Sequence, residues 1–114
     1  NGDMKLKLCD FGFTRLLQNT DEALTDYVAT RWYRSPELLV GAEYGKPMDV
    51  WAAGCIMAEL VDGQPLFSGE NEIEHLYLIR KTVVELTATQ NDVFHRNPRF
   101  AGLKFPEMTH RESL

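Results

Sequence analysis

The sequence predicts a mainly helical α+β fold in one small domain. A long apolar segment has a proline at its start (Pro47) and a glycine after its end (Gly63), which is typical of a helix in a soluble protein. A second apolar stripe recurs at helical spacing behind Asn71, a good N-cap residue. A short alternation of apolar residues and lysines over 4–8 predicts one half-buried strand. With 114 residues and an apolar fraction of 44%, the chain suits a single globular core.

The predicted strand follows a tight-turn signal at residues 1–3. A turn directly before a strand implies a neighbouring strand, which we expect upstream of Asn1. Segment 13–30 is polar over much of its length and has no helical periodicity, so it is predicted to be a long loop. Loops of that length are usually functional or disordered.

Two of the three predicted helices cover 35–41 and 47–61. In the first, Ser35 is the expected N-cap, Pro36 fits the first helical position, and Gly41 ends the helix. The second has almost no polar face, and such a helix is normally buried on most sides. If the chain is isolated from its usual neighbours, we expect exposed apolar surface on this helix and marginal stability.

The third helix is predicted over 71–86. Glu74 stands three residues after Asn71, which is the spacing of a capping box. Its apolar stripe favours core packing over a partner-binding face, although 76–79 allows the second interpretation. The sequence after Leu86 is irregular and predicts no further helix. The stripe consists of Ile73, Leu76, Ile79, Val83 and Leu86.

Charge and composition exclude several classes of function. A net charge of −5 and the absence of a basic stripe argue against nucleic-acid binding. The longest apolar run, 51–60, is too short to span a membrane. Cys9 and Cys55 do not form a disulfide framework and suggest reduced, intracellular thiols. The histidines are too scattered for a zinc site; they are His75, His95 and His110.

The triplet Asp10-Phe11-Gly12 follows the strand pattern directly. A carboxylate at this place can hold Mg²⁺ against the β- and γ-phosphates of ATP, because magnesium prefers hard oxygen ligands. Phe11 would then pack inward and set the direction of Asp10, and Gly12 would let the backbone turn. The alternative is a surface Asp-Phe-Gly turn without a ligand.

A second group of residues can form a phosphorylation switch. Thr25 and Tyr27 carry hydroxyls in the predicted loop, and Arg31 and Arg34 lie just downstream. A phosphate adds about −1.5 to −2 charge, and guanidinium groups bind phosphate through paired hydrogen bonds. Our hypothesis is that phosphorylated Tyr27 pairs with both arginines and orders the loop. The alternative is that these are ordinary loop and surface residues; the residues alone favour this alternative, and only the family resemblance given next favours the switch.

The order of three motifs extends these interpretations to a family. Glu37 of Ser-Pro-Glu lies 27 residues after Asp10, and Asp49 of Asp-Val-Trp-Ala-Ala-Gly lies 12 residues after Glu37. This arrangement resembles the activation segment and central helix of a eukaryotic protein kinase. The closest resemblance is to the cyclin-dependent-kinase-like family, within the CMGC group of cyclin-dependent and mitogen-activated kinases. It rests on TDYVATRWYRSPELLVG, YGKPMDVWAAGCIMAELVDGQPLFSGENEIEHLYLI and FHRNPRFAGLKFPE, and covers nearly the whole chain.

The resemblance implies roles for individual residues. Thr30 matches a threonine that contacts the catalytic loop in serine/threonine kinases, and 32–34 would line the pocket for the substrate residue after the phosphorylated one. Glu37 would pair with a buried arginine, and Asp49 would accept hydrogen bonds from the catalytic-loop backbone; both partners are expected outside this chain. Cys9 either faces the nucleotide pocket or is a small buried residue. By the same resemblance, Thr30, Trp32 and Tyr33 belong to the substrate pocket, and Trp51 and Gly54 have structural roles.

The resemblance further implies a partial kinase C-lobe, with an activation segment over 10–37, helices within 47–86 and the start of an insert over 87–114. The implied activity is transfer of the ATP γ-phosphate to serine or threonine of protein substrates, with Mg²⁺ as cofactor. Partners would be substrates and an upstream activating kinase, unless the loop is autophosphorylated; no nucleic acid and no membrane is expected. The implied location is the cytoplasm, the nucleus or both, and family resemblance adds the cilium. A pseudokinase or scaffold lobe remains the alternative, and the isolated chain is expected to be inactive.

Overall fold

The computed structural model describes residues 2–12, 14, 31–83, 85–100 and 102. Most of the predicted loop over 13–30, including Thr25, Tyr27 and Thr30, lies outside them. The described part is mainly helical, as predicted, and contains no strand. Its elements are the 3-10 helix η1 (Arg31–Tyr33), the α-helices α1 (Pro36–Val40), α2 (Pro47–Asp62), α3 (Glu72–Thr82) and α4 (Ala88–Arg96), and the 3-10 helix η2 (Pro98–Phe100).

Proline and glycine set the ends of α1 and α2 as the sequence indicates. Each helix has proline in its first turn. Each ends at a glycine in the left-handed region, Gly41 with φ 77° and Gly63 with φ 76°. Ser35 occupies the N-cap position of α1, but its hydroxyl makes no capping hydrogen bond. The predicted side-chain cap is therefore wrong, and α1 begins through backbone bonds from Leu38 and Leu39 to the Ser35 carbonyl.

Helix α3 begins at the predicted N-cap, with one change in its hydrogen bonds. The Asn71 side-chain oxygen accepts bonds from the backbone N–H groups of Ile73 (3.1 Å) and Glu74 (2.9 Å). In a capping box the Glu74 carboxylate would return to Asn71. It accepts instead from the Glu70 N–H, at 2.7 Å. The cap therefore extends one residue further into the preceding loop.

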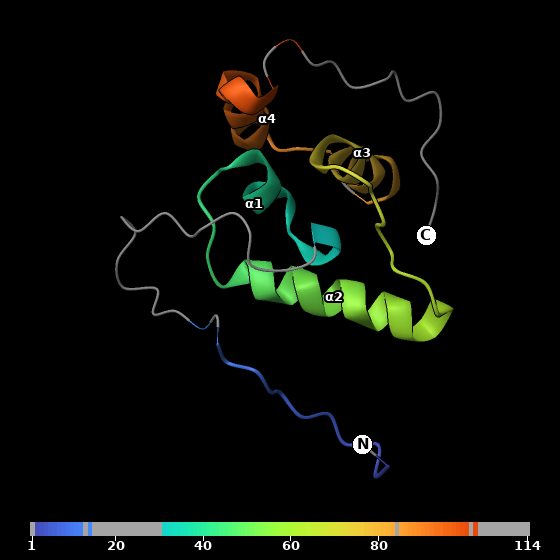
Figure 1. Cartoon of the computed structure of the whole chain (residues 1–114). Coiled ribbons are helices and arrows are strands. Elements are labelled where there is room, and N and C mark those ends of the chain that lie inside the picture. The colour runs from blue at the N-terminus through green and yellow to red at the C-terminus, as the bar shows by residue number, and fades with distance from the viewer. Residues whose placement is uncertain (1, 13, 15–30, 84, 101, 103–114) are drawn as a thin grey trace.

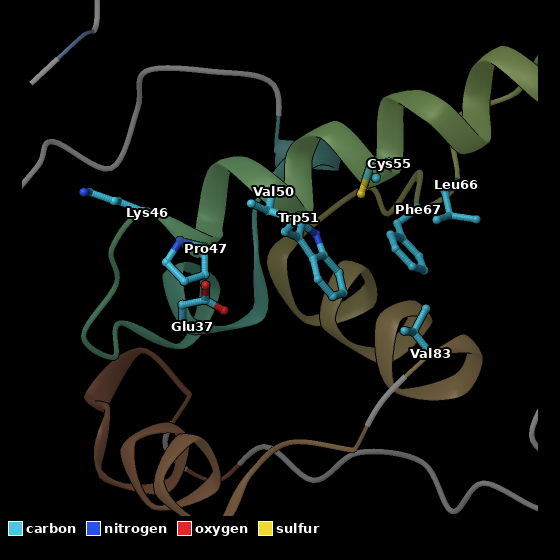
Figure 2. Close-up of a pocket in the computed structure, with 10 residues that line it drawn as sticks. Glu37, Lys46, Pro47, Val50, Trp51, Cys55, Leu66, Phe67 and Val83 are labelled. Carbon is cyan, nitrogen blue, oxygen red and sulfur yellow. The ribbon is translucent and has the colours of Figure 1, made fainter.

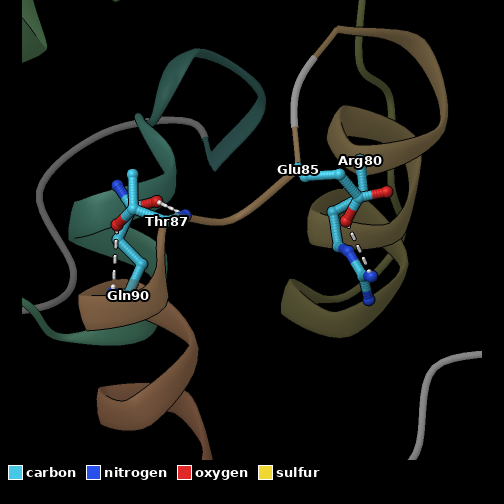
Figure 3. Close-up of polar contacts among 4 residues, drawn as sticks. All are labelled: Arg80, Glu85, Thr87 and Gln90. Carbon is cyan, nitrogen blue, oxygen red and sulfur yellow. Dashed lines mark hydrogen bonds and ion pairs between the residues drawn. The ribbon is translucent and has the colours of Figure 1, made fainter.

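The predicted end of the third helix is wrong, because α3 stops at Thr82 and a separate helix α4 follows (Figure 3). The Thr82 hydroxyl donates to the Leu78 carbonyl at 2.9 Å, a bond that slightly destabilises a helix and often bends it. Thr87 then opens α4 with a full capping box: its hydroxyl accepts from the Gln90 N–H, and the Gln90 side chain accepts from the Thr87 N–H. Arg80 and Glu85 form an ion pair across the junction at 3.0 Å.

Helices α1, α3 and α4 and the turn η1 lie on one side of the long helix α2 (Figure 1). The core forms where they meet, and α1 contacts both α3 and α4. The Asn97 side chain donates to the Val40 carbonyl at 3.3 Å and so joins the end of α4 to the end of α1. Phe94 and Phe100 stack with centroids 4.7 Å apart. Buried apolar side chains are Leu39, Val40, Cys55, Phe67, Leu76, Ile79, Phe94 and Phe100.

The strand predicted over 4–8 is not formed. A turn is present at Gly2 and Asp3, but the next residues have no regular structure. Met4, Leu6 and Leu8 are all largely exposed, so the alternating pattern buries neither face. A strand needs a partner for its backbone groups, and no described segment pairs with this one. Figure 1 draws it leading away from the helices.

Helix α2 buries one stripe and exposes another. Of its residues only Cys55 is buried, with Trp51 and Glu59 half-buried on the same face. The opposite stripe is apolar and open to solvent, so the prediction that this helix is buried on most sides is wrong for this chain, whereas the predicted exposed apolar surface is present. No described helix combines the length and apolar character that crossing a membrane requires. The most exposed apolar side chains of the stripe are Val50 (73%), Met57 (67%), Leu60 (77%) and Val61 (91%).

We expect the isolated chain to bind a hydrophobic dye through this stripe, because contiguous apolar surface of this kind is unusual on a soluble domain. Replacing Met57 and Leu60 together with lysine should reduce dye fluorescence strongly. Each exposed substitution should change stability by no more than about 0.5 kcal/mol. Dye fluorescence and far-UV circular dichroism measure the two effects, with Gln64→Lys as the control for added charge. Equal dye binding by the double variant would contradict this assignment of the stripe.

Candidate functional site

Asp10 is one of two non-glycine residues with a left-handed backbone among those described, with φ 61°. This region is uncommon outside glycine, although aspartate enters it more readily than most residues. Its side chain is exposed. A backbone held in this region at a candidate ligand is the kind of local strain that accumulates at functional sites.

The residues around Asp10 are open to solvent. Phe11 is 67% exposed, so the predicted inward packing does not occur against any described residue. Cys9 is exposed and free, which contradicts the alternative of a small buried residue. A Cβ added at Gly12 would stand 3.4 Å from the Asp10 side-chain oxygen Oδ1, an ordinary contact. Gly12 therefore lies against the carboxylate, and the turn is continued by a 3.0 Å bond from the Thr14 N–H to the Phe11 carbonyl.

The donor set at Asp10 is compatible with magnesium held on a nucleotide. Mg²⁺ is usually bound through one or two carboxylates, with water and substrate phosphates supplying the other ligands. Asp10 offers one exposed carboxylate, and the described residues contain no cluster of three acidic, histidine or cysteine side chains. A single carboxylate can hold the ion only together with the phosphates, so this site fits a metal–nucleotide complex better than a free metal.

The predicted phosphate-binding arginines lie at the two ends of one tight turn. The Arg34 N–H donates to the Arg31 carbonyl at 3.0 Å, across η1. In a 3-10 turn, side chains three residues apart point to the same side of the turn. Arg31 is exposed, and its terminal nitrogen Nη2 donates to the Glu70 carbonyl at 2.9 Å. Arg34 is half-buried.

The two aromatic residues between these arginines are held by different elements. The Trp32 indole N–H donates to the Gly69 carbonyl in the loop before α3, at 3.1 Å. The Tyr33 hydroxyl donates to the Glu59 carboxylate on α2, at 2.6 Å. This bond raises the pKa of the Tyr33 hydroxyl, with burial adding to the shift. The predicted substrate segment is thus fixed to both α2 and the start of α3.

Glu37 borders a cavity of about 720 Å³ between α1, α2 and the end of α3 (Figure 2). Figure 2 shows Glu37 beside Pro47 at one end of the cavity, with Trp51 and Phe67 further along it. Burial raises the pKa of the Cys55 thiol in its wall. The lining is largely apolar, and no described cation pairs with Glu37.

The remaining predicted site residues all lie on α2. Asp49 is exposed in the first turn, where a carboxylate is favoured by the helix dipole. Trp51 stacks on Phe67 with ring centroids 5.9 Å apart, and its indole N–H is buried without a hydrogen-bond partner among the described residues. A Cβ at Gly54 would meet no atom within 4 Å. Trp51 therefore packs α2 against Phe67, whereas no described contact requires glycine at 54.

Comparison with known proteins decides the family. Residues 1–105 match the family model described as "Protein kinase domain". The chain belongs to the protein kinase domain family. Its helices are part of a kinase C-lobe, as the order of the motifs predicted.

Several relatives carry the narrower name that the motifs also suggested. The kinase chain is 58% identical to mouse "Cyclin-dependent kinase-like 5" over 110 residues, which are 96% of this chain and 12% of the relative. It is 52% identical to rabbit "Cyclin-dependent kinase-like 2", again over 96% of the chain and 19% of the relative. Against "Cyclin-dependent kinase-like 1" of Caenorhabditis elegans the identity is 53%, with 96% and 31% covered. The chain therefore spans less than a third of the length of these relatives.

The structure joins some of the predicted kinase residues and separates others. No described hydrogen bond or ion pair connects Asp10 with the turn at Arg31–Tyr33, whereas that turn is tied to α2. Glu59, Gly69 and His75, which lie around this turn, were not among the predicted site residues. For Glu59 a signal was present, since a lone glutamate far inside an apolar helix needs a polar partner.

Proposed function

We propose that the full-length protein is a serine/threonine protein kinase that transfers the γ-phosphate of ATP to protein substrates. The observation that carries the proposal is the exposed Asp10 carboxylate on a left-handed backbone, within a chain that matches the protein kinase domain. An intact aspartate here favours an active kinase over a pseudokinase or scaffold. Relatives named cyclin-dependent kinase-like support the same class.

In this mechanism Asp10 would hold Mg²⁺ on the phosphates. When bound, the ion would neutralise charge that develops on the transferred phosphoryl group. The segment Arg31–Tyr33, fixed by Gly69 and Glu59, would present the acceptor peptide, and Thr30 favours serine or threonine as acceptor. Phosphoryl transfer depends on positioning and electrostatics. The parts that supply the base and the phosphate-anchoring lysine are not recognisable in these 114 residues, so we propose that the isolated chain is inactive.

The acceptor prediction is tested with γ-labelled ATP, Mg²⁺ and a mixed peptide library. The full-length protein should produce phosphoserine and phosphothreonine, measured by phosphoamino acid analysis, and little phosphotyrosine in the peptides. The 114-residue chain, assayed in parallel, should transfer no label. Dominant peptide phosphotyrosine would refute the acceptor class. Absence of any transfer, with retained binding of protein partners, would favour the scaffold alternative.

We also propose that phosphorylation of Tyr27 activates the kinase through Arg31 and Arg34. The common turn of the two arginines supports this, because residues three apart in such a turn start from the same side of it, and guanidinium groups bind phosphate through paired hydrogen bonds. The Glu70 carbonyl engages one of several Arg31 donors and leaves others for an anion. Thr25 is the second candidate for the same modification.

Tyr27→Phe and Arg34→Ala should each lower peptide phosphorylation about tenfold or more, because a hydrogen bond to a charged group contributes about 1.5–3 kcal/mol. Activity assays of the full-length kinase and mass-spectrometric mapping of its phosphates measure this. Tyr44→Phe is the matched control, since Tyr44 lies outside the predicted switch. Full activity in both variants would rule out the switch.

A further inference from the structure

The loop 68–71 holds the predicted substrate segment through backbone carbonyls. Gly69 accepts the Trp32 indole N–H at 3.1 Å, and Glu70 accepts the Arg31 guanidinium at 2.9 Å. These contacts join segments 37 and 39 residues apart in sequence. Two side chains of one short turn are therefore positioned by two successive carbonyls of one loop.

The first residues of α3 fix the geometry of that loop. Gly69 is buried, and a Cβ at this position would overlap the backbone of His75 on α3. The Glu70 N–H is held by the Glu74 carboxylate at 2.7 Å. Asn71 caps the helix directly after the loop. The two carbonyls therefore cannot shift without moving the start of α3.

His75 is a buried residue of α3 that lies against Gly69 of this loop. It is 0% exposed, and neither ring nitrogen has a hydrogen bond of good geometry among the described residues. Its ring packs edge-on against Phe67 with centroids 6.0 Å apart. An uncharged imidazole suits this place, whereas a charged one would be buried without a counterion.

The charge of His75 is set by its burial and by the charged and polar groups around it. Burial lowers the pKa of His75, and the positive charges of Arg31 and Arg34 lower it further; the Arg34 and Phe67 carbonyls act in the opposite direction and do not reverse the shift. The acidic groups nearest in sequence are Glu74, which is exposed, and Glu72, which is half-buried; Glu70 in the loop is also exposed. His75 is therefore neutral at pH 7.

We propose that loop 68–71, supported by neutral His75, is a positioning element for the protein substrate, and that protonation of His75 releases it. The inference rests on the proposed kinase function. Protonation places a third positive charge near Arg31 and Arg34. The resulting repulsion weakens the hydrogen bonds that hold Arg31 and Trp32 to the loop. Because the folded pKa is lowered, the unfolded state binds the proton more tightly, and the arrangement weakens as pH falls through and below about 6.5.

The first test compares Gly69→Ala with wild type in the full-length kinase. The KM for an acceptor peptide should rise about tenfold, because small misplacements of a positioned substrate cost one to two orders of magnitude. The KM for ATP should stay within about twofold, which a general loss of structure would not allow. Trp32→Phe, which removes only the indole donor, should raise the peptide KM in the same direction. Gly2→Ala, where a Cβ meets no atom within 4 Å, is the control.

The second test is the pH profile. From pH 7.5 to 5.5 the peptide KM of wild type should rise, that of His75→Gln should stay flat, and His95→Gln, an exposed histidine on α4, should follow wild type. Retained pH dependence in His75→Gln, or an unchanged peptide KM in Gly69→Ala, would overturn the proposal. The Trp32 indole N–H resonance, assigned with Trp32→Phe, should shift in Gly69→Ala and on acidification. If the full-length protein has no kinase activity, the proposed function fails. The Trp32 resonance still tests whether the contact between Trp32 and Gly69 depends on pH and on Gly69.

Discussion

Replacing Asp10 with asparagine is expected to lower peptide phosphorylation by the full-length kinase by about 100-fold or more. A group that acts on charge developing in the transition state contributes about 10²–10³ in rate. An asparagine keeps a side-chain oxygen but loses the negative charge that attracts Mg²⁺. It also tolerates the left-handed backbone observed at this position, with φ 61°, so the turn itself should persist.

Two measurements separate loss of the metal ligand from loss of structure. Affinity for ATP should depend on Mg²⁺ in wild type, and this dependence should disappear in Asp10→Asn. Asp92→Asn is the matched control, because Asp92 is an exposed aspartate on α4, away from the predicted site. A variant at Asp10 that keeps Mg²⁺-dependent ATP binding and full activity would refute both the metal role and the proposed mechanism.

Local signals predicted the helices that have strong ends. Pro47 and Gly63 bracket α2 because proline suits a first turn and glycine adopts the left-handed C-cap without strain. Helix α4 was missed because the prediction depended on apolar periodicity, and its main signal is the polar Thr87–Gln90 capping box. The strand over 4–8 failed for the opposite reason: its alternation is clear, but a strand depends on a partner that the described residues do not provide.

In the candidate site, too, features set by local sequence could be predicted, and features set by distant contacts could not. Motif order was enough to predict the kinase family and to single out Asp10, Arg31 and Arg34 as candidates, whereas the 3-10 turn at Arg31–Tyr33 was not predicted. The need of Glu59 for a polar partner could be inferred, but its pairing with Tyr33 and the contact of Trp32 with Gly69 could not, because they join residues 26 and 37 apart. Such pairings are set by how α2 and α3 pack, and no short-range pattern encodes that packing.

Replacing Phe67 with alanine is expected to cost the isolated chain about 3–5 kcal/mol, the usual range for deleting a buried aromatic ring. Phe67 is 1% exposed, stacks on Trp51 and contacts the His75 ring edge-on. It joins α2 to α3, and the other buried phenylalanines among the described residues are Phe94 and Phe100. Domains are stable by only about 5–15 kcal/mol, and a chain this small lies at the low end. Phe67→Ala should therefore lose most of its helical signal in water.

Far-UV circular dichroism during urea titration measures this loss, and two further variants give it a scale. Phe67→Leu keeps most of the volume and should cost less than about 2 kcal/mol, since shape changes at roughly constant volume are tolerated best. Phe11→Ala is the matched control, because the same ring is 67% exposed there and should contribute no more than about 0.5 kcal/mol. If Phe67→Ala and Phe11→Ala unfold at the same urea concentration, the contact of Phe67 with Trp51 and His75 does not hold α2 against α3, and the attachment of the substrate segment to both helices loses its structural basis.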